Sequence, residues 1–444
     1  MTSPARAVAA RVLERVESEG AFADLALDAE LTRAGIAPRD AALATELVYG
    51  TLRWQRYLDW ILAPHSRRPL ERLDPRPRVL LRMTAYQLAL LERIPSFAAV
   101  DDAVTLARQR GRPGVAEFVN AVLRAFARRG AREREPAAPR DLAEAAALRS
   151  SFPTWLARRW IARFGPDEAV ALMAALNERP PLTVRANFLR TTREALAERL
   201  RHDDALDTTP TRAPEGLVVA GGGRPASWPA FVAGALTVQD EASMLVARLL
   251  EPRPGETVAD VCAAPGTKTT HLAELMGDRG RIVAFDPQPA RLVLVADGAA
   301  RLGITIVETR AGSAESLAPG FRDACDAVLV DAPCSNLGVL RRNPEAKWRR
   351  GPDDLAASAA RQREILAAAA TMVRPGGRLV YATCSLEPEE NQDVVAALRA
   401  GRRDFTPDPP ASFPIALDPD GVLRCLPHRH GTDGFTAVRL RRTA

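Results

Sequence analysis

Lysine is nearly absent from this chain of 444 residues. Of its 61 basic residues, only Lys268 and Lys347 are lysines, and all the others are arginines. A chain so biased toward arginine should carry arginine at these two positions as well, unless a compact ammonium does something there that a planar guanidinium does not. Unless two codons survived by chance, this scarcity marks both lysines as candidate functional residues.

Other absences exclude whole classes of protein. The cysteines (Cys262, Cys325, Cys334, Cys384 and Cys425) are odd in number and show neither a CxxC pair nor Cys/His metal spacing. This pattern argues against a disulfide framework and a zinc site, so we predict reduced thiols and no bound metal. The first residues contain no apolar signal region, and no stretch approaches the ~18 apolar residues of a membrane span. We therefore expect a cytoplasmic protein without a membrane partner.

The charge balance points toward a polyanionic partner. The formal net charge is +6 and the isoelectric point is near 9.4. Such a balance fits nucleic-acid binding, although many basic proteins bind no nucleic acid. Charge alone leaves the partner open.

The chain divides into three predicted domains, of which the first, residues 1–140, is entirely helical. Apolar residues recur at helical spacing in residues 115–126, and the same pattern is present at 41–61 and 79–94. A charged, proline-containing stretch at residues 128–140 is typical of a linker. This part is predicted to be a helical bundle.

The second predicted domain, residues 148–231, mixes helices and strands in a small α+β unit. We expect helices at 153–164, 167–176 and 193–201, and strands at 182–186 and 216–220.

The third predicted domain, residues 234–444, alternates strands with helices, which requires parallel pairing. We expect strands at Thr257–Cys262, Arg281–Phe285, Ile304–Glu308, Ala327–Val330 and Arg378–Thr383, and a closing strand at 434–440. A long helix is expected from Asp353 to Val373, ended by Pro375-Gly-Gly377. The predicted fold is α/β, a doubly wound sheet.

Two thiols follow buried strands of this sheet. Cys334 comes just after the expected strand 327–330, and Cys384 just after the strand 378–383. In open α/β sheets, ligands bind beyond the carboxyl ends of the strands, so both thiols are predicted to meet at one crevice.

The first strand of the sheet leads into a glycine-containing turn, Asp260-Val-Cys-Ala-Ala-Pro-Gly-Thr-Lys268. This turn is neither GxGxxG nor a P-loop, which disfavours dinucleotides and ATP. Twenty residues after Gly266, Asp286 follows the second strand, where a carboxylate commonly binds both ribose hydroxyls. A nucleoside pocket without a pyrophosphate cradle suits S-adenosylmethionine better than NAD. The alternative is that Asp286 caps the next helix.

A family resemblance rests on the run 260–268 together with Val330-Asp-Ala-Pro-Cys-Ser335 and Ala382-Thr-Cys-Ser385. These motifs resemble the Sun-type RNA cytosine carbon-5 methyltransferases. Further similar segments, at 234–243, 341–348 and 431–435, cover the C-terminal half in order. The N-terminal bundle, with Phe118-Val-Asn-Ala-Val-Leu-Arg124, resembles the NusB-type RNA-binding domain.

The resemblance implies a Rossmann-like class I methyltransferase sheet, preceded by a small RRM-like subdomain and the NusB-like bundle. This pairing is typical of the bacterial enzymes that methylate one cytosine of small-subunit (16S) ribosomal RNA before subunit assembly. We therefore expect S-adenosylmethionine as the cofactor, ribosomal RNA as the partner, and a monomer. Two alternatives remain: the same chemistry on transfer RNA or another ribosomal site, and a non-catalytic RNA-binding assembly or antitermination factor.

The two cysteines take different roles in the resembled family. The cysteine of the Thr-Cys-Ser motif, here Cys384, is the nucleophile, and the Pro-Cys cysteine, here Cys334, assists release. DNA carbon-5 methyltransferases use a Pro-Cys thiol as nucleophile, so Pro333-Cys334 alone would support the opposite assignment. The expected cofactor-binding residues are Cys262, Ala263, Ala264, Pro265, Gly266, Thr267, Lys268, Asp286, Ser313 and Asp331.

Charged residues complete the predicted site. A nearby positive charge lowers a thiol pKa, and Lys268 is a plausible source. Asp331 lies three residues before Cys334 and is expected to hydrogen-bond the cytosine ring. RNA contacts are expected from Lys347, Trp348, Arg341 and Arg342, by phosphate binding and base stacking. The alternative for this segment is an exposed loop with one buried aromatic.

The chain departs from the family pattern at two positions. Ser313 stands where the family more often has an acid that binds the adenine amino group, so either Ser313 or Glu315 is expected to make that contact. Thr267 replaces a frequent glycine beside Lys268 but leaves Gly266 in place.

Overall fold

The computed structural model describes residues 2–92, 94–110, 113–128, 137–221 and 223–443. The chain forms two compact units: the first unit comprises Met1–Glu178 and Leu340–Arg349, and the second comprises Arg179–Val339 and Arg350–Ala444. Most of the predicted linker, residues 129–136, lies outside the described residues. The three predicted domain boundaries stay a prediction. Within the described ranges, no helix has the length and apolar character to cross a lipid bilayer.

The first unit is helical. Its helices are α1 (Pro4–Ser18), α2 (Ala23–Ala34), α3 (Pro38–Arg53), α4 (Gln55–Leu62), α5 (Pro75–Leu90), α6 (Ser96–Arg110), α7 (Val115–Arg128), α8 (Leu142–Arg149), α9 (Thr154–Phe164), α10 (Pro166–Asn177) and the short α17 (Ala346–Arg349). The expected helix at 41–61 is two helices, because the chain leaves helical geometry at Trp54.

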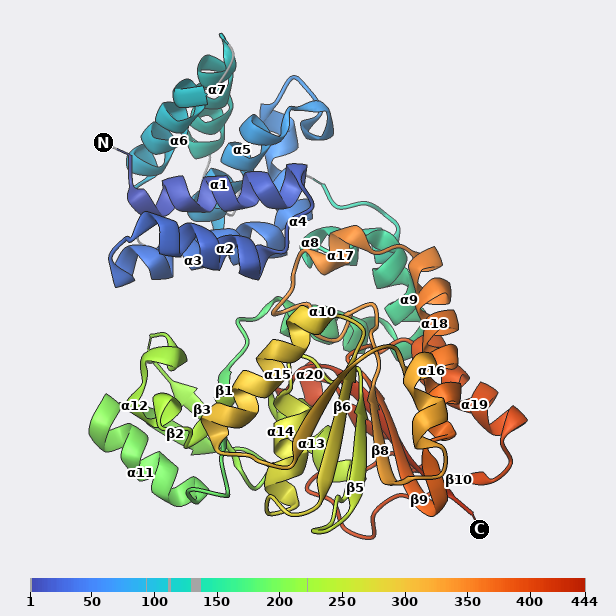
Figure 1. Cartoon of the computed structure of the whole chain (residues 1–444). Coiled ribbons are helices and arrows are strands. Elements are labelled where there is room, and N and C mark those ends of the chain that lie inside the picture. Colours follow the sequence, from blue (N-terminus) through green and yellow to red (C-terminus); the bar gives the residue numbers. More distant parts are fainter. Residues whose placement is uncertain (1, 93, 111–112, 129–136, 222, 444) are drawn as a thin grey trace. The chain divides into compact units, whose positions relative to one another are not determined.

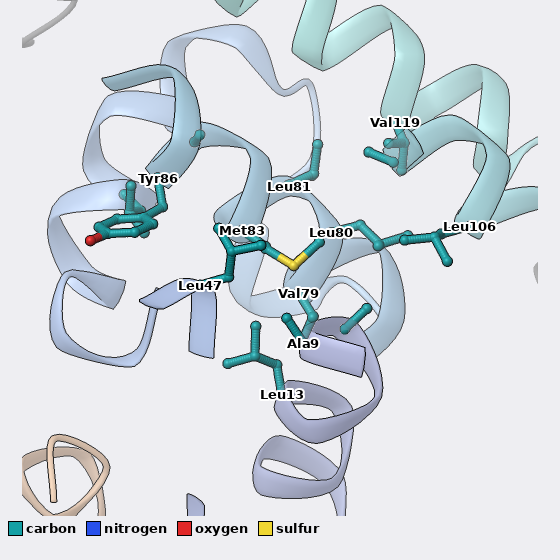
Figure 2. Packing of buried hydrophobic residues seen from close by; sticks show 14 of the residues in the cluster. Ala9, Leu13, Leu47, Val79, Leu80, Leu81, Met83, Tyr86, Leu106 and Val119 are labelled. Carbon is teal, nitrogen blue, oxygen red and sulfur yellow. The ribbon is translucent and has the colours of Figure 1, made fainter. Parts of the chain in front are cut away.

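One apolar core holds α1 to α7 together. Leu13 from α1, Leu47 from α3 and Met83 from α5 point toward one another (Figure 2) and are nearly inaccessible to water. Gly50 of α3 packs so closely on Tyr86 that an added Cβ would lie 2.0 Å from its ring. The helical stripes of the sequence therefore identified the buried faces.

The second unit contains a small antiparallel sheet and a large, mostly parallel one. The small sheet has the order β2-β3-β1-β4, from β1 (Leu182–Ala186), β2 (Asp207–Pro210), β3 (Gly216–Ala220) and β4 (Leu236–Val238), with α11 (Arg193–Asp204) and α12 (Pro229–Val232) beside it. Strands β1 and β3 are where the sequence predicts them.

The large sheet has the order β10-β12-β9-β8-β5-β6-β7, with β11 paired to β12. Its strands are β5 (Thr257–Val261), β6 (Arg281–Asp286), β7 (Val307–Ala311), β8 (Cys325–Asp331), β9 (Val373–Thr383), β10 (Phe405–Pro407), β11 (Leu423–Cys425) and β12 (Phe435–Arg442). The five strands from β9 to β7 in this order run parallel, while β12 is antiparallel to β9.

Helices cover both faces of this sheet (Figure 1). Alternate residues of each central strand point to opposite faces, so Val258 and Leu329 join the core beneath α13 (Glu241–Leu250) and α14 (Thr267–Leu275). Ala259 and Val328 instead join the core beneath α18 (Pro352–Ala370) and α19 (Gln392–Gly401). The predicted doubly wound α/β architecture is confirmed.

Two predicted elements are shifted. The strand expected at 304–308 begins three residues later, at Val307. The apolar residue Ile304 suggested a strand but packs into the core before it, whereas β7 itself is an exposed edge strand of mostly polar residues. The expected long helix ends at Ala370 rather than Val373. Pro375-Gly-Gly377 does not terminate it but lies within β9, where pairing to β8 is irregular.

Candidate active site

The two thiols meet at the carboxyl edge of the large sheet. Strands β8 and β9 are parallel neighbours, with Asp331 opposite Ala382 in register. Cys334 and Cys384 each follow the end of one of these strands, and their Sγ atoms are 3.1 Å apart. The predicted convergence of the two cysteines therefore exists in the folded chain.

Cys384 is a protonated thiol in the free protein. Its hydrogen bond with Cys334, followed by burial, holds the pKa of Cys384 well above the usual range of a thiol. The negative charge of Asp331 acts in the same direction, whereas Lys268 lowers the pKa. The charge of Lys268 thus acts in the expected direction, although the other effects outweigh it in the free protein, and its part in activating the thiol stays a prediction.

Lys268 and Asp331 form an ion pair beside the thiols. Lys268 Nζ lies 2.7 Å from Asp331 Oδ2 and 4.9 Å from the centre of the Phe435 ring. Lys268 belongs to the first turn of α14, and Asp331 is the last residue of β8. The pair places both signs of charge at the edge where a polar ring could bind.

The glycine turn between β5 and α14 forms a tight cradle. Gly266 has φ +101°, and an added Cβ would lie 2.9 Å from Val295 Cα in α15 (Pro289–Leu302). The turn is held by the amide of Ala263, which donates to Phe285 O, and by that of Gly266, which donates to Ala263 O. The remaining predicted cofactor residues of the turn, Cys262, Ala264, Pro265 and Thr267, lie on the same short segment. Burial raises the pKa of Cys262 to about 12, so its thiol stays neutral.

Two carboxylates flank this cradle. Asp286 ends β6 and is 2% exposed; its Oδ1 accepts a hydrogen bond from the amide of Gln288. Gln288, not Asp286, is the residue that precedes α15 as its N-cap. Asp260 is fully buried and accepts a hydrogen bond from Thr269 through Oδ2, while Oδ1 has no partner among the described residues. Burial raises the pKa of Asp260 to about 7.

The two candidates for an adenine contact both have protein partners. Ser313 caps the short α16 (Ala314–Leu317) by accepting from the amide of Ser316. Glu315 pairs with Arg361, with 2.7 Å between Oε1 and Nη1. The adenine contact stays a prediction for either residue.

Sequence reasoning missed a buried carboxylate that joins the two cysteine loops. Glu390 accepts hydrogen bonds from the amide and hydroxyl of Ser335, from the hydroxyl of Ser385 and from Gln362. Ser335 and Ser385 directly follow Cys334 and Cys384, so one side chain fixes both loops. The only signal was an acidic run after the second thiol, which has no diagnostic spacing.

Sequence reasoning also missed Asn336. Its Oδ1 lies 3.0 Å from Cys384 Sγ and 3.8 Å from Cys334 Sγ. Its φ of +64° places it in the left-handed region, which asparagine tolerates better than most residues. Only that backbone turn lets a residue two positions after Cys334 reach both sulfurs.

The segment around the second lysine corrects an expectation. Lys347 is 1% exposed, and its ammonium donates to Arg53 O and Asn177 Oδ1 and lies 4.0 Å from the centre of the Phe152 ring. Arg341 is 3% exposed. The prediction that these two side chains contact RNA phosphate is therefore wrong, because both are packed inside the first unit.

The other two residues of that segment are half-buried. Trp348 donates from its indole nitrogen to Leu52 O, at 2.8 Å, so one edge of its ring is already engaged. Arg342 is also half-buried. RNA contact by Trp348 and Arg342 stays a prediction.

This chain is similar to known proteins in both sequence and fold. Residues 247–441 match the family model described as 16S rRNA methyltransferase RsmB/F, residues 3–128 match the NusB family, and residues 152–224 match the ferredoxin-like domain of RsmF/B-like methyltransferases. The chain is 36% identical to the probable ribosomal RNA small subunit methyltransferase B of Bacillus subtilis (strain 168), over 98% of each chain.

Solved structures show the same similarity. The crystal structure of PH0851 has 29% identity and a TM-score of 0.85, with all of both chains covered. The structure of NSun6 from Pyrococcus horikoshii with SFG has 26% identity and a TM-score of 0.59, and covers 66% of this chain and 99% of that one.

Proposed function

The chain belongs to the RsmB/F family of ribosomal RNA methyltransferases, and on that premise we propose that it transfers a methyl group from S-adenosylmethionine to carbon 5 of a cytosine in 16S ribosomal RNA. The observation that carries this proposal is the pair of thiols 3.1 Å apart at the ends of β8 and β9. Two convergent thiols suit a reaction that needs one nucleophile and one proton acceptor.

The residues around the glycine turn of the second unit suit S-adenosylmethionine as a ligand. The carboxylate of Asp286 suits a nucleoside, and the partnerless Oδ1 of buried Asp260 suits a cation. A relative of 26% identity is solved with SFG, an analogue of S-adenosylmethionine. When bound, S-adenosylmethionine supplies an electrophilic methyl group. The turn residues 262–268, Asp286, Asp331 and Ser313 are the proposed contacts.

Cys384 is the proposed nucleophile. Carbon 5 of cytosine is too weak a nucleophile to attack a sulfonium methyl group unaided. Cys384 gives its proton to solvent, Sγ adds to carbon 6, and the electrons of the C5–C6 double bond shift toward ring nitrogen 3, which leaves an enamine whose carbon 5 is nucleophilic. Asp331 is placed to accept a hydrogen bond from the amino group of the cytosine, and the ammonium of Lys268 beside it supplies positive charge against the negative charge that develops on the ring.

Cys334 is the proposed base for release. After methylation, carbon 5 carries both the new methyl group and its original proton. Cys334 gives its own proton to solvent and then takes the carbon 5 proton; the electrons of the C–H bond reform the ring double bond, the bond between Cys384 and carbon 6 breaks, and Cys384 leaves as the thiolate. The 3.1 Å separation of the two sulfurs supports this division of roles, because carbon 5 and carbon 6 are adjacent ring atoms.

The first unit is the proposed RNA-binding part, because residues 3–128 match the NusB family and the chain carries a net charge of +6. We propose a cytoplasmic monomer that binds the RNA before assembly is complete. The target base must leave its stack, because carbon 6 is shielded within a helix.

The direct test incubates the purified protein with 16S RNA and methyl-labelled S-adenosylmethionine, then digests the RNA to nucleosides. Label in 5-methylcytosine is expected, and in the Cys384→Ser variant none. Label on adenine or guanine contradicts the proposal. Stronger labelling of transfer RNA keeps the chemistry and changes the target, whereas no label on any RNA favours a non-catalytic assembly factor.

A further inference from the structure

Asn336 contacts both sulfurs of the candidate site. On the basis of the proposed function, we propose that Asn336 is a positioning residue whose Oδ1 accepts the Cys384 S–H bond and keeps the nucleophile protonated and aimed until the RNA binds. The 3.0 Å separation between Oδ1 and Cys384 Sγ is well within the range of a sulfur hydrogen bond, while the 3.8 Å separation from Cys334 Sγ is at its limit. Asn336 therefore acts chiefly on Cys384.

The backbone fixes where this amide points. The residue before it, Ser335, is clamped by Glu390, whose Oε1 accepts from the Ser335 amide at 2.8 Å. On the other side, the amide of Val339 donates to Asn336 O at 3.1 Å. With both flanks held and φ at +64°, the side chain is directed across to the loop of the other cysteine. The amide is thus pre-organised rather than free to search for a partner.

An acceptor at this position favours the neutral thiol. A carbonyl oxygen stabilises an S–H bond but repels a thiolate, so it raises the thiol pKa. Cys384 has one proton to donate, and its two acceptors are Asn336 Oδ1, 3.0 Å away, and Cys334 Sγ, 3.1 Å away; the amide oxygen is the stronger acceptor. Asp331 also favours the thiol, and Lys268 favours the thiolate. Asn336 therefore favours the protonated, inactive form of the nucleophile, and Lys268 opposes this effect.

Two substitutions isolate this effect. Asn336→Gly removes the acceptor, and glycine adopts a φ of +64° without strain, so the loop should fold as before. Asn336→Asp keeps the shape and adds a negative charge next to the sulfur. The measured quantity is the pH midpoint for alkylation of Cys384 by iodoacetamide, read by peptide mass spectrometry on the full-length, reduced protein without RNA or cofactor.

The expected shifts have opposite signs. Loss of one hydrogen bond to the thiol should change its ionisation about fivefold, so Asn336→Gly lowers the midpoint by about 0.7 pH unit with the plateau rate unchanged. Asn336→Asp raises the midpoint. Buried Cys425 should stay unlabelled in every variant, which shows that the fold is intact.

An unchanged midpoint in Asn336→Gly, with only the plateau rate altered, would mean that Asn336 merely limits access, and it overturns the inference. A raised midpoint in the same variant would mean that the amide N–H faces the sulfur and stabilises the thiolate, which also overturns it. Because no RNA is present, this result is separate from the proposed function. Opposite shifts without 5-methylcytosine formation reject the function alone, and methylation without the shifts rejects the role of Asn336 alone.

Discussion

Lys268 and Lys347 are marked by the same scarcity of lysine in the sequence, but their surroundings in the fold differ. Lys268 opens α14 and pairs with Asp331 beside two thiols. Lys347 lies in α17, where its ammonium is enclosed by a backbone carbonyl, an amide oxygen and an aromatic ring. Both ammonium groups lie within a short distance of an oxygen acceptor and an aromatic ring, a geometry that suits a compact cation better than a planar guanidinium. The scarcity of lysine thus marks unusual surroundings and does not distinguish chemistry from packing.

The largest expected effect is a loss of methyl-transfer activity when Lys268, but not Lys347, is replaced. Replacing Lys268 by Met removes the partner of Asp331 and the positive charge facing Cys384, so methyl transfer to 16S RNA should fall about 10²–10³-fold. The thermal midpoint should change little, because the ion pair is partly exposed. Activity close to that of the wild type would remove Lys268 from the site.

The next largest effect is a loss of stability of the first unit when Lys347 is replaced. Lys347→Met has a similar length but leaves Arg53 O and Asn177 Oδ1 without their donor. Each buried acceptor left unpaired costs about 1–3 kcal/mol, so the opening free energy of the first unit should fall by about 3 kcal/mol. Hydrogen exchange at amides of α3 and α10 measures this loss.

The matched control is Arg349→Met in the same short helix, at an exposed position, which should change exchange in α10 by far less. Methyl transfer per folded molecule should stay within about twofold for Lys347→Met. A large loss of activity at full stability would mean that Lys347 acts in catalysis after all.

A third prediction concerns the pH dependence of cofactor binding, through Asp260 in the turn that contains Lys268. Asp260 has a pKa of about 7 in the free protein, and a bound cation favours its ionised form. Binding of S-adenosylmethionine below pH 7 must therefore release a proton, so its Kd should be about tenfold higher at pH 6 than at pH 8. Calorimetry measures this difference. Asp260→Asn should flatten the profile, and a profile that stays steep in the variant assigns the proton to another group.

The smallest effect is the pH response of the buried lysine. Burial, reinforced by the charge of Arg53, lowers the pKa of Lys347 well below its ordinary value. The unfolded chain therefore binds more protons than the folded one from that lowered pKa up to the ordinary value, and stability rises with pH across this window. The advantage of the wild type over Lys347→Met should therefore grow as the pH rises through this window in denaturant titrations. A constant or shrinking advantage would show that Lys347 stays charged in the fold.

The parallel core of the large sheet could be predicted because its strands are short apolar runs buried on both faces. Strand β7 could not be placed correctly, because an exposed edge strand with residues such as Glu308 and Arg310 has no apolar pattern. The glycines at 376 and 377 suggested a helix end but lie in a strand. They lie between the pairs Cys325–Val373 and Ala327–Arg378, where the register with β8 shifts, so the strand continues through an irregular stretch that a local pattern does not reveal.

The site was predictable where strand ends decide the geometry. Cys334, Cys384, Asp331 and Lys268 follow parallel strands or begin the helix after one, so they meet at the same edge. Asn336 and Glu390 reach the site only through a left-handed backbone turn and through loops that approach each other in three dimensions. The burial of Lys347 depends on partners such as Arg53, 294 positions away, which no local pattern reveals.

The most direct test of the account is covalent trapping on RNA. Incubated with 16S RNA and S-adenosylmethionine, the Cys334→Ala protein should accumulate as a denaturant-resistant protein–RNA adduct, because the carbon 5 proton cannot be removed. The Cys384→Ala protein should form no adduct. Adduct formation by Cys384→Ala and none by Cys334→Ala would reverse the roles of the two thiols, and no adduct with either variant would contradict the covalent mechanism.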